Sequence, residues 1–340
     1  PVKVEVVNAN FFRMYPAENF QPLAPGDSLT VKFCCTNGLK KMSHAPEGTY
    51  WVSQSGSKQG IPLPVGLTIQ PLKGMETEDW YPAPDKIYAS NLALETTAQL
   101  QQTDIFPSVK EAVPATGKEG FAIENKVKLT FHPDFANEAE LLKEKLATIH
   151  GLEVVSEAPV TVYLDYLPER ETAVNGEYYR IDTGNGLINI SASTSHGIFN
   201  GTQTLLSLLK GQEKPFRLEA LSIRDYPDLP YRGQMLDIAR NFTTVEHLKK
   251  LVDVISSYKL NVLHFHFSDD EGWRLEIPGL EELTAIGSRR GHTTDEKDWL
   301  YPAYDGGYDP CAATSGNGYY TREEFIDLLR YATERHVQVI

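Results

Sequence analysis

Cysteine is scarce in this sequence, with three among 340 residues. Cys34 and Cys35 are adjacent and would point to opposite faces of a strand, while Cys311 stands alone, so the cysteines make a poor disulfide framework. The sequence also lacks an apolar run of the roughly 18–20 residues that span a bilayer. Its first ten residues, PVKVEVVNAN, contain no apolar core of a signal peptide. We therefore expect no membrane span and no secretion signal within this sequence.

A basic excess is missing as well, because 32 Lys and Arg face 46 Asp and Glu, giving a formal net charge of −14. Such a chain has no surplus of cations to neutralise phosphates, which argues against a nucleic-acid partner. The glycine-rich signatures G-x-G-x-x-G, Walker A and G-x-S-x-G are all absent. Nucleotide binding and serine-based acyl transfer are therefore unsupported.

What the sequence does contain predicts a multidomain protein, since 41% hydrophobic residues suffice for real cores and 340 residues exceed one ordinary domain. Residues 1–103 are short runs rich in Val, Thr and aromatics between Gly, Pro and Asn, which predicts a β-sandwich. Residues 104–225 mix strands with two helices, at ANEAELLKEKLATI and SHGIFNGTQTLLSLLKG, and predict an α+β domain. A turn at Gly184-Asn185-Gly186 is expected to join two of its strands.

Residues 226–340 show a different period. Apolar strands at 232–239, 260–268 and 337–340 alternate with helices that open on the Thr-x-x-Glu capping boxes at 243–246 and 321–324. This order predicts a parallel sheet covered on both faces, the first βα units of a (β/α)₈ TIM barrel. Such a barrel needs roughly 200–250 residues. Only about 115 residues follow Tyr226 here, so we expect the barrel to be incomplete in this chain.

Polar residues gather directly after the predicted strands, at the barrel end that carries active sites. Arg240 follows the first strand, and Asp269, Asp270 and Glu271 follow the second. Neighbouring carboxylates can act as acid and base where their surroundings separate their pKa values, but consecutive acids usually point in different directions. Asp269 is the better cleft candidate because it comes first after the strand. Trp273 is compatible with stacking on a sugar ring and equally with packing the following loop.

A pair of histidines is also compatible with metal binding. His264 and His266 lie two apart on one predicted strand and could bind a metal together with Asp269, as in a metal-dependent hydrolase. The alternative is that both are hydrogen-bonded interior side chains. We favour the alternative and expect no metal site, because no further cluster at ligand spacing follows.

The segments YRGQMLDIARNF and LNVLHFHFSDDEGWRLEI, separated by a helix, closely resemble glycoside hydrolase family 20, the exo-acting β-N-acetylhexosaminidases that include bacterial chitobiases. The preceding YYRIDTGNGLINISASTSHGIFNGTQTLLSLL resembles the accessory α+β domain of that family. The first hundred residues resemble, more loosely, the N-terminal domain of chitobiases. The resemblance covers most of the chain.

The resemblance implies roles for several residues. Arg240 corresponds to the arginine that binds hydroxyls of the terminal sugar, Asp269 to an acid beside it, and Asp270 and Trp273 to supporting positions. The family is a known exception to the two-carboxylate scheme, since the acetamido group of the substrate attacks the anomeric carbon and configuration is retained. It implies a β-linked N-acetylhexosamine substrate (GlcNAc or GalNAc), no metal or organic cofactor, and a periplasmic or secreted protein.

The same resemblance places the catalytic Asp-Glu pair on a later barrel strand than those in this sequence. We therefore expect no catalytic residue within this chain, which we interpret as the N-terminal portion of an enzyme. The alternative is a non-catalytic carbohydrate-binding protein that keeps the sugar-binding rim.

Overall fold

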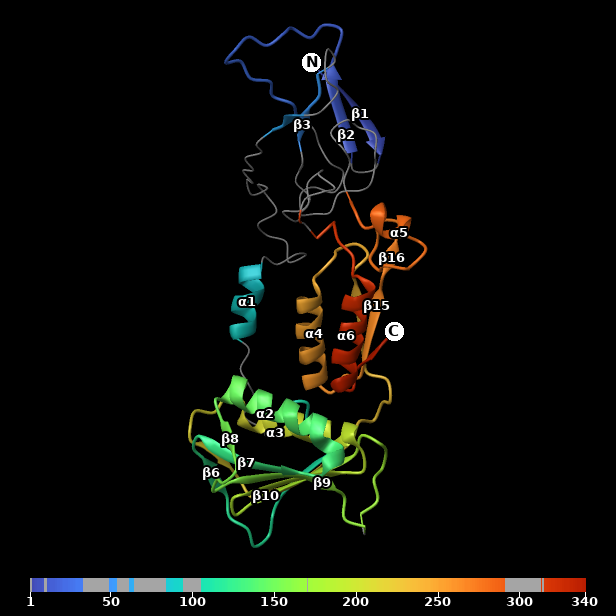
Figure 1. The fold of residues 1–340 in the computed structure, drawn as a ribbon. Helices are drawn as coiled ribbons and strands as arrows, with labels where there is room; N and C mark the ends of the chain where they lie inside the picture. Colours follow the sequence, from blue (N-terminus) through green and yellow to red (C-terminus); the bar gives the residue numbers. More distant parts are fainter. Residues whose placement is uncertain are drawn as a thin grey trace. The chain divides into compact units, whose positions relative to one another are not determined.

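The computed structural model describes residues 2–8, 11–32, 49–53, 61–63, 84–93, 105–169, 171–290, 313 and 315–340 (Figure 1). The chain divides into two compact units, each built from separate stretches of sequence. The first unit comprises Pro1–Leu72, Leu236–Val245 and Phe265–Ile326, and the second comprises Lys73–Met235, Glu246–His264 and Asp327–Ile340. None of the helices in the described ranges has the length and apolar character that crossing a bilayer requires.

The N-terminal segment of the first unit contains two strand pairs. β1 (Val2–Asn8) and β2 (Phe11–Pro16) are antiparallel, and β3 (Tyr50–Trp51) pairs with β4 (Ile61–Pro62). The predicted strands at the start of the chain and around Trp51 are therefore present. The complete β-sandwich stays a prediction, because much of residues 1–103 lies outside the described residues.

One helix was not expected in the segment predicted to be all-β. α1 spans Pro84–Leu92 in the second unit. Its sequence, PDKIYASNL, has a proline at the first helical position, where the missing N–H has no intrahelical partner to lose. The helix formers Lys86, Ala89 and Leu92 follow. The prediction of strands alone for residues 1–103 was wrong at this point.

A seven-stranded mixed sheet organises the second unit, in the order β5-β13-β10-β11-β9-β7-β8. The strands β11, β9, β7 and β8 pair in parallel, and β5, β13, β10 and β11 pair antiparallel. In sheet order, the bounds are Glu111–Pro114, Leu221–Asp225, Tyr179–Gly184, Leu187–Ala192, Thr161–Tyr166, Lys126–Phe131 and Glu153–Val155. A separate pair joins β6 (Phe121–Ile123) to β12 (Phe216–Leu218).

Two helices cover one face of this sheet (Figure 1). α2 spans Ala136–His150 and α3 spans Ser195–Leu209, and a short 3-10 turn, η2 (Pro133–Phe135), leads into α2. Alternate residues of the central strands point into the core beneath the helices, since a strand turns successive side chains to opposite faces. The buried set includes Val162, Leu164, Ile181, Ile188 and Ile190. Both predicted helices and the predicted β10–β11 hairpin are confirmed.

The hairpin turn follows from local chemistry. Asn185 and Gly186 both have positive φ, at 53° and 78°. Glycine adopts this conformation without strain and asparagine tolerates it better than most residues. By contrast, β5, β7, β8 and β13 were not predicted from the sequence, although all four lie within the sheet.

A three-stranded sheet, β14-β15-β18, corresponds to the predicted barrel strands. β14 (Gly233–Asp237) is followed by α4 (Val245–Ser257) and β15 (Val262–His266), and α6 (Arg322–Glu334) precedes β18 (Gln338–Val339), which is parallel to β15. The second capping box is confirmed: the Glu324 amide donates to Thr321 Oγ1 at 3.2 Å, and the Thr321 amide donates to Glu324 Oε2 at 2.8 Å. The (β/α)₈ barrel, and its being incomplete in this chain, stay predictions.

Short regular elements, which the sequence analysis did not anticipate, follow β15. β16 (Ser268–Asp269) and β17 (Gly272–Trp273) form a tight antiparallel pair, and α5 (Glu282–Ala285) is one helical turn. These elements are too short to leave a periodic signal in the sequence. The β16–β17 turn carries the three acids singled out above.

We predict that Gly201→Ala destabilises the second unit by about 1–3 kcal/mol, the usual cost of overpacking a core. Gly201 lies inside α3, and a Cβ there would lie 2.5 Å from Cγ2 of the buried Ile190. In an open helix position the same change would stabilise by roughly 0.5–1 kcal/mol. Urea unfolding measures the difference.

The matched control is Gly176→Ala, because a Cβ there meets nothing closer than Thr194 Cγ2 at 3.9 Å. We expect it to stay within about 0.5 kcal/mol of the unaltered protein. Equal stability of the two variants would contradict the close packing of α3 on β11.

Candidate functional site

The ends of two neighbouring strands meet in the first unit. β14 ends at Asp237 and β15 at His266. The amides of Ile238 and Ala239 both donate to the His266 carbonyl, at 3.2 and 3.1 Å. This link brings the residues that follow β14 next to those that follow β15.

Arg240 lies at this junction and contacts three carboxylates. Its Nη1 is 2.7 Å from Asp237 Oδ2, its Nη2 is 2.6 Å from Asp269 Oδ2, and its Nε is 3.2 Å from Glu271 Oε2. The Arg240 amide also donates to Asp237 Oδ1 at 3.1 Å, so the side chain and backbone of this arginine are both fixed by Asp237. The side chain nevertheless keeps 44% of its surface exposed. The guanidinium is thus oriented by acids and still open to a ligand.

The acids around Arg240 differ in the direction in which their surroundings shift the pKa. The hydrogen bond with His266, at 2.7 Å, is the main reason that the pKa of Asp269 falls well below its usual range, with the Asp270 amide and Arg240 also contributing. Burial raises the pKa of Asp237, but its hydrogen bonds from Arg240 outweigh this and lower the pKa overall. Both carboxylates therefore stay charged beside Arg240 in mildly acidic solution.

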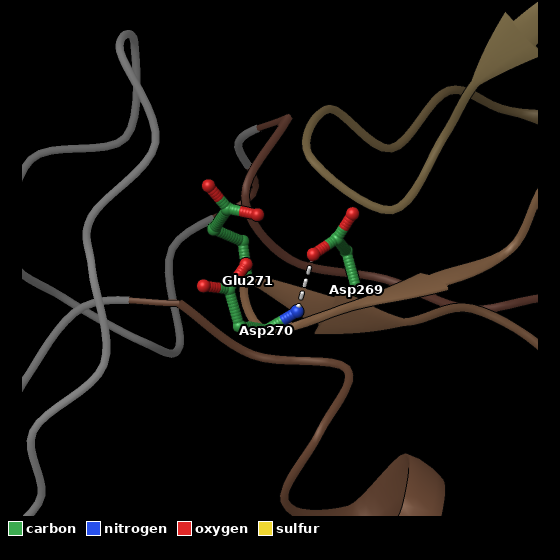
Figure 2. A group of neighbouring side chains, drawn as sticks. All are labelled: Asp269, Asp270 and Glu271. Carbon is green, nitrogen blue, oxygen red and sulfur yellow. Dashed lines mark hydrogen bonds between the residues drawn. The ribbon is translucent and has the colours of Figure 1, made fainter.

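Glu271 shows the opposite tendency. Burial, followed by the neighbouring Asp270 carboxylate, raises the pKa of Glu271 above its usual value. Its Oε2 atom is buried and makes no hydrogen bond of good geometry, although Arg240 Nε lies 3.2 Å away. Figure 2 shows the three consecutive acids on their turn, with the Asp270 amide donating to Asp269 Oδ1. Their carboxylates point in different directions, as expected for consecutive acids.

A fully buried arginine, Arg274, follows the turn and donates hydrogen bonds to backbone carbonyls around it. Its Nε donates to the Ile238 carbonyl at 3.0 Å and its Nη2 to the Ala239 carbonyl at 2.8 Å. Its Nη1 donates to the carbonyls of Ser288 and Gly318, at 2.8 and 3.0 Å. Burial lowers the pKa of Arg274 to about 10, so the side chain remains a cation at neutral pH. Its fork of donors holds the loop after β14 against β17.

The two residues before this arginine, Gly272 and Trp273, are constrained by their contacts. A Cβ on Gly272 would lie 2.7 Å from the Ala239 carbonyl oxygen, so only glycine fits there. Trp273 donates from Nε1 to the Leu275 carbonyl, and its amide donates to the Gly287 carbonyl at 2.8 Å. Trp273 thus contributes to holding the loop, and its stacking on a sugar ring stays a prediction.

The proposed metal-ligand set does not come together. Among the described residues, the single group of three potential ligands with donor atoms within 4.8 Å of one another is Asp269, Asp270 and Glu271. Neither His264 nor His266 belongs to it, and Arg240 pairs with two of its members. His266 instead acts as the hydrogen-bond partner of Asp269.

Comparison with known proteins assigns most of the chain to one family. Residues 229–340 match the catalytic domain of glycosyl hydrolase family 20, and residues 102–226 match domain 2 of the same family. The chain belongs to glycosyl hydrolase family 20. The predicted resemblance is therefore confirmed, as are the folds of family domain 2 and of the catalytic-domain segment that this chain contains.

Several relatives from family 20 match parts of this chain. An N,N'-diacetylchitobiase from Vibrio harveyi is 38% identical over 197 residues, which cover 57% of this chain and 22% of that protein. A β-hexosaminidase from Porphyromonas gingivalis is 32% identical over 217 residues, covering 59% of this chain and 25% of that protein. The chain thus spans about a fifth to a quarter of the length of these curated relatives.

Two solved structures of β-N-acetylhexosamine-releasing enzymes align with this chain. The exo-β-N-acetylglucosaminidase from Vibrio harveyi in complex with N-acetylglucosamine aligns with a TM-score of 0.57 at 33% identity, covering 69% of this chain and 35% of that chain. A mutant Streptomyces plicatus β-hexosaminidase in complex with the product GlcNAc aligns at 0.55 and 26% identity, covering 70% and 45%.

Some residues of this site were predicted from the sequence, and others were not. Arg240 and Asp269 are adjacent, as the family resemblance implied, and Asp270 contributes its backbone amide. Asp237 and the buried Arg274 were not identified as site residues from the sequence. The signal for Arg274 was its position between Trp273 and an apolar residue, where an unpaired cation would be costly.

We predict that Asp269 titrates well below the ordinary Asp pKa of ~3.9 and that His266→Ala moves the titration upward. The reason is that the His266 hydrogen bond is the largest cause of the lowered pKa. Carboxyl-carbon NMR between pH 2 and 6 measures the shift. The control is His264→Ala on the same strand, whose exposed side chain should leave Asp269 unchanged. An unaltered Asp269 titration in His266→Ala would contradict the described geometry.

We also predict that Arg274→Met destabilises the protein by about 3 kcal/mol or more. Each buried carbonyl left without a donor costs roughly 1–3 kcal/mol. The carbonyls of Ile238, Ala239 and Gly318 lose their donor, whereas the Ser288 carbonyl keeps the Gly318 amide. Denaturant unfolding checks this, with Arg330→Met as control because Arg330 is exposed on α6. If both variants lost the same stability, Arg274 would not hold the loop.

Proposed function

We propose that this chain forms part of an exo-β-N-acetylhexosaminidase, which removes terminal β-linked GlcNAc or GalNAc from chitooligosaccharides or other glycans. Membership of family 20 supports the reaction class. The names of the relatives, N,N'-diacetylchitobiase and β-hexosaminidase, support the substrate class. Two structural neighbours with bound N-acetylglucosamine support a site for the same sugar.

The observation that carries the proposal is the orientation of Arg240. Its Nη1 donates to Asp237, and its Nη2 and Nε lie within ion-pair distance of Asp269 and Glu271. Nη1 and Nη2 carry two N–H groups each, so each of these nitrogens can offer a donor to a ligand. A planar fork of two donors suits neighbouring hydroxyls of a sugar ring, and the exposed side chain is accessible to one. Arg240 binds the terminal sugar in this proposal, and Asp269 positions Arg240.

Charge supports the same division of roles. A neutral sugar gains most from a donor whose orientation is fixed before binding, because less freedom is then lost on binding. The low pKa of Asp269 keeps its ion pair with Arg240 intact as pH falls through the usual Asp range. The pair is lost only at lower pH, where Asp269 itself becomes protonated. The binding function of the site therefore extends to acidic pH.

The chemistry follows the substrate-assisted scheme of the family. The acetamido carbonyl of the substrate attacks the anomeric carbon, a Glu protonates the leaving oxygen, and the Asp before it orients the acetamide. In this proposal the Asp-Glu pair comes from the part of the family's catalytic domain that residues 229–340 do not include. The residues of this chain contribute binding and orientation, and no step requires a metal.

We predict that Arg240→Ala lowers kcat/KM for a terminal β-N-acetylglucosaminide by about a hundredfold or more, measured in the protein with its whole catalytic domain. Two hydrogen bonds from a charged donor contribute roughly 1.5–3 kcal/mol each, and every 1.4 kcal/mol is tenfold. Arg240→Lys keeps the charge but not the fork, so an intermediate loss is expected.

Arg330→Ala, on the exposed side of α6, is the matched control and should keep the rate of the unaltered enzyme. A metal chelator should also leave the rate unchanged, whereas loss of activity on chelation would favour the metal-dependent alternative. A nearly unaltered kcat/KM in Arg240→Ala would remove Arg240 from the binding site. Sugar binding without any turnover would favour the carbohydrate-binding alternative.

A further inference from the structure

Two histidines of the second unit stack face to face, in a region unrelated to Arg240. His196 lies in the first turn of α3, and His336 follows α6 with a left-handed backbone, at φ 57°. Their ring centroids are 4.7 Å apart with an interplanar angle of 12°. Phe199 packs against His336 at 5.3 Å between centroids. The two imidazoles therefore lie in close face-to-face contact.

Each imidazole also contacts a carboxylate. His196 Nε2 lies 3.2 Å from Glu177 Oε2, and His336 Nε2 lies 2.9 Å from Glu138 Oε1. Glu177 is already engaged, because Arg232 donates to both of its oxygens, with 3.1 Å between Nη1 and Oε1. The negative charge of Glu177 beside His196 is thus neutralised by Arg232. If His196 became protonated, Arg232 would repel the imidazolium.

This cluster joins two segments of the family fold within the second unit. Glu138, Glu177 and His196 belong to residues 102–226, which match domain 2, whereas Arg232 and His336 belong to residues 229–340 of the catalytic domain. Glu138 is buried, at 2% exposed, and the side chains of Glu177, His196, Arg232 and His336 are partly buried. The contacts that hold α2 and α3 against Arg232 and the segment around His336 are therefore largely polar and titratable.

Solvent can reach one side of the cluster. A cavity of about 430 Å³ is lined by Glu177, Thr194, Ser195, His196 and Asp228, among others. Protons can therefore reach His196 without the unit unfolding. Asp228 is a further charged group on the cavity wall.

We propose that the stacked pair of His196 and His336 is an acid-sensitive latch between domain 2 and the catalytic-domain segments that pack on it. Protonation of His196 puts an imidazolium against the face of His336 and beside Arg232, which weakens the packing of α3 on the segment around His336. This proposal does not depend on the hydrolase activity proposed above.

The protonation behaviour of His196 sets the pH range. Burial, together with the neighbouring His336 and Arg232, lowers the pKa of His196 from 6.5 to about 4, although Glu177 opposes the shift. While His196 is packed on His336, its imidazole therefore resists protonation, whereas after opening it takes up a proton at about pH 6.5. Stability from the latch is fully present above that pH and is lost as pH falls toward about 4.

Hydrogen exchange on the unaltered chain tests the latch directly. With intrinsic rates corrected for pH, opening of residues 195–201 and 332–340 should increase about tenfold for each pH unit between roughly pH 6 and 4.5, as uptake of one proton requires. In His196→Phe, which keeps an aromatic ring but cannot be protonated, this pH dependence should be largely lost.

His264→Gln serves as the control, because it removes an exposed histidine of the same unit and should keep the full pH dependence. Protection that is independent of pH over this range would overturn the proposal, and so would an unchanged pH dependence in His196→Phe. If that variant does not fold, the pH dependence of the unaltered chain and of His264→Gln still decides.

Discussion

The ion pair between Arg240 and Asp269 is the contact on which the site depends, because it joins residues that follow two different strands. Asp237 fixes the backbone and one side of the guanidinium, and His266 keeps Asp269 ionised. The strand ends themselves are tied by hydrogen bonds to the His266 carbonyl. The outcome is a cation held in one orientation with donors still available. For a neutral ligand such as a sugar, that orientation provides specificity that charge alone does not.

The parts that the sequence predicted are those determined by local chemistry or by strand position. Asn185 and Gly186 define a hairpin turn through their backbone preferences, and the Thr321 capping box begins α6 where expected. The adjacency of Arg240 and Asp269 came from the family motif, and the strand-end argument led independently to the same two residues. Each of these features needs only a few neighbouring residues or the rule that polar residues at barrel strand ends form the site.

The features that were missed depend on contacts between distant segments. Arg274 bonds to carbonyls of residues far from it in sequence, so nothing in its immediate surroundings marks it as buried. Glu138 is likewise a buried acid on an amphipathic helix, and its partner His336 lies nearly two hundred positions later in the sequence. Such polar contacts determine how segments associate, and a periodic pattern in the sequence does not record them.

The central claim, that Arg240 is held by acids in order to bind a sugar, is tested most directly by a crystal structure of the protein with its whole catalytic domain and N-acetylglucosamine bound. The account predicts that Nη1 and Nη2 of Arg240 donate to hydroxyls of the sugar while both nitrogens keep their bonds to Asp237 and Asp269. A bound sugar that makes no contact with Arg240, or one that displaces Asp269 from it, would contradict the account.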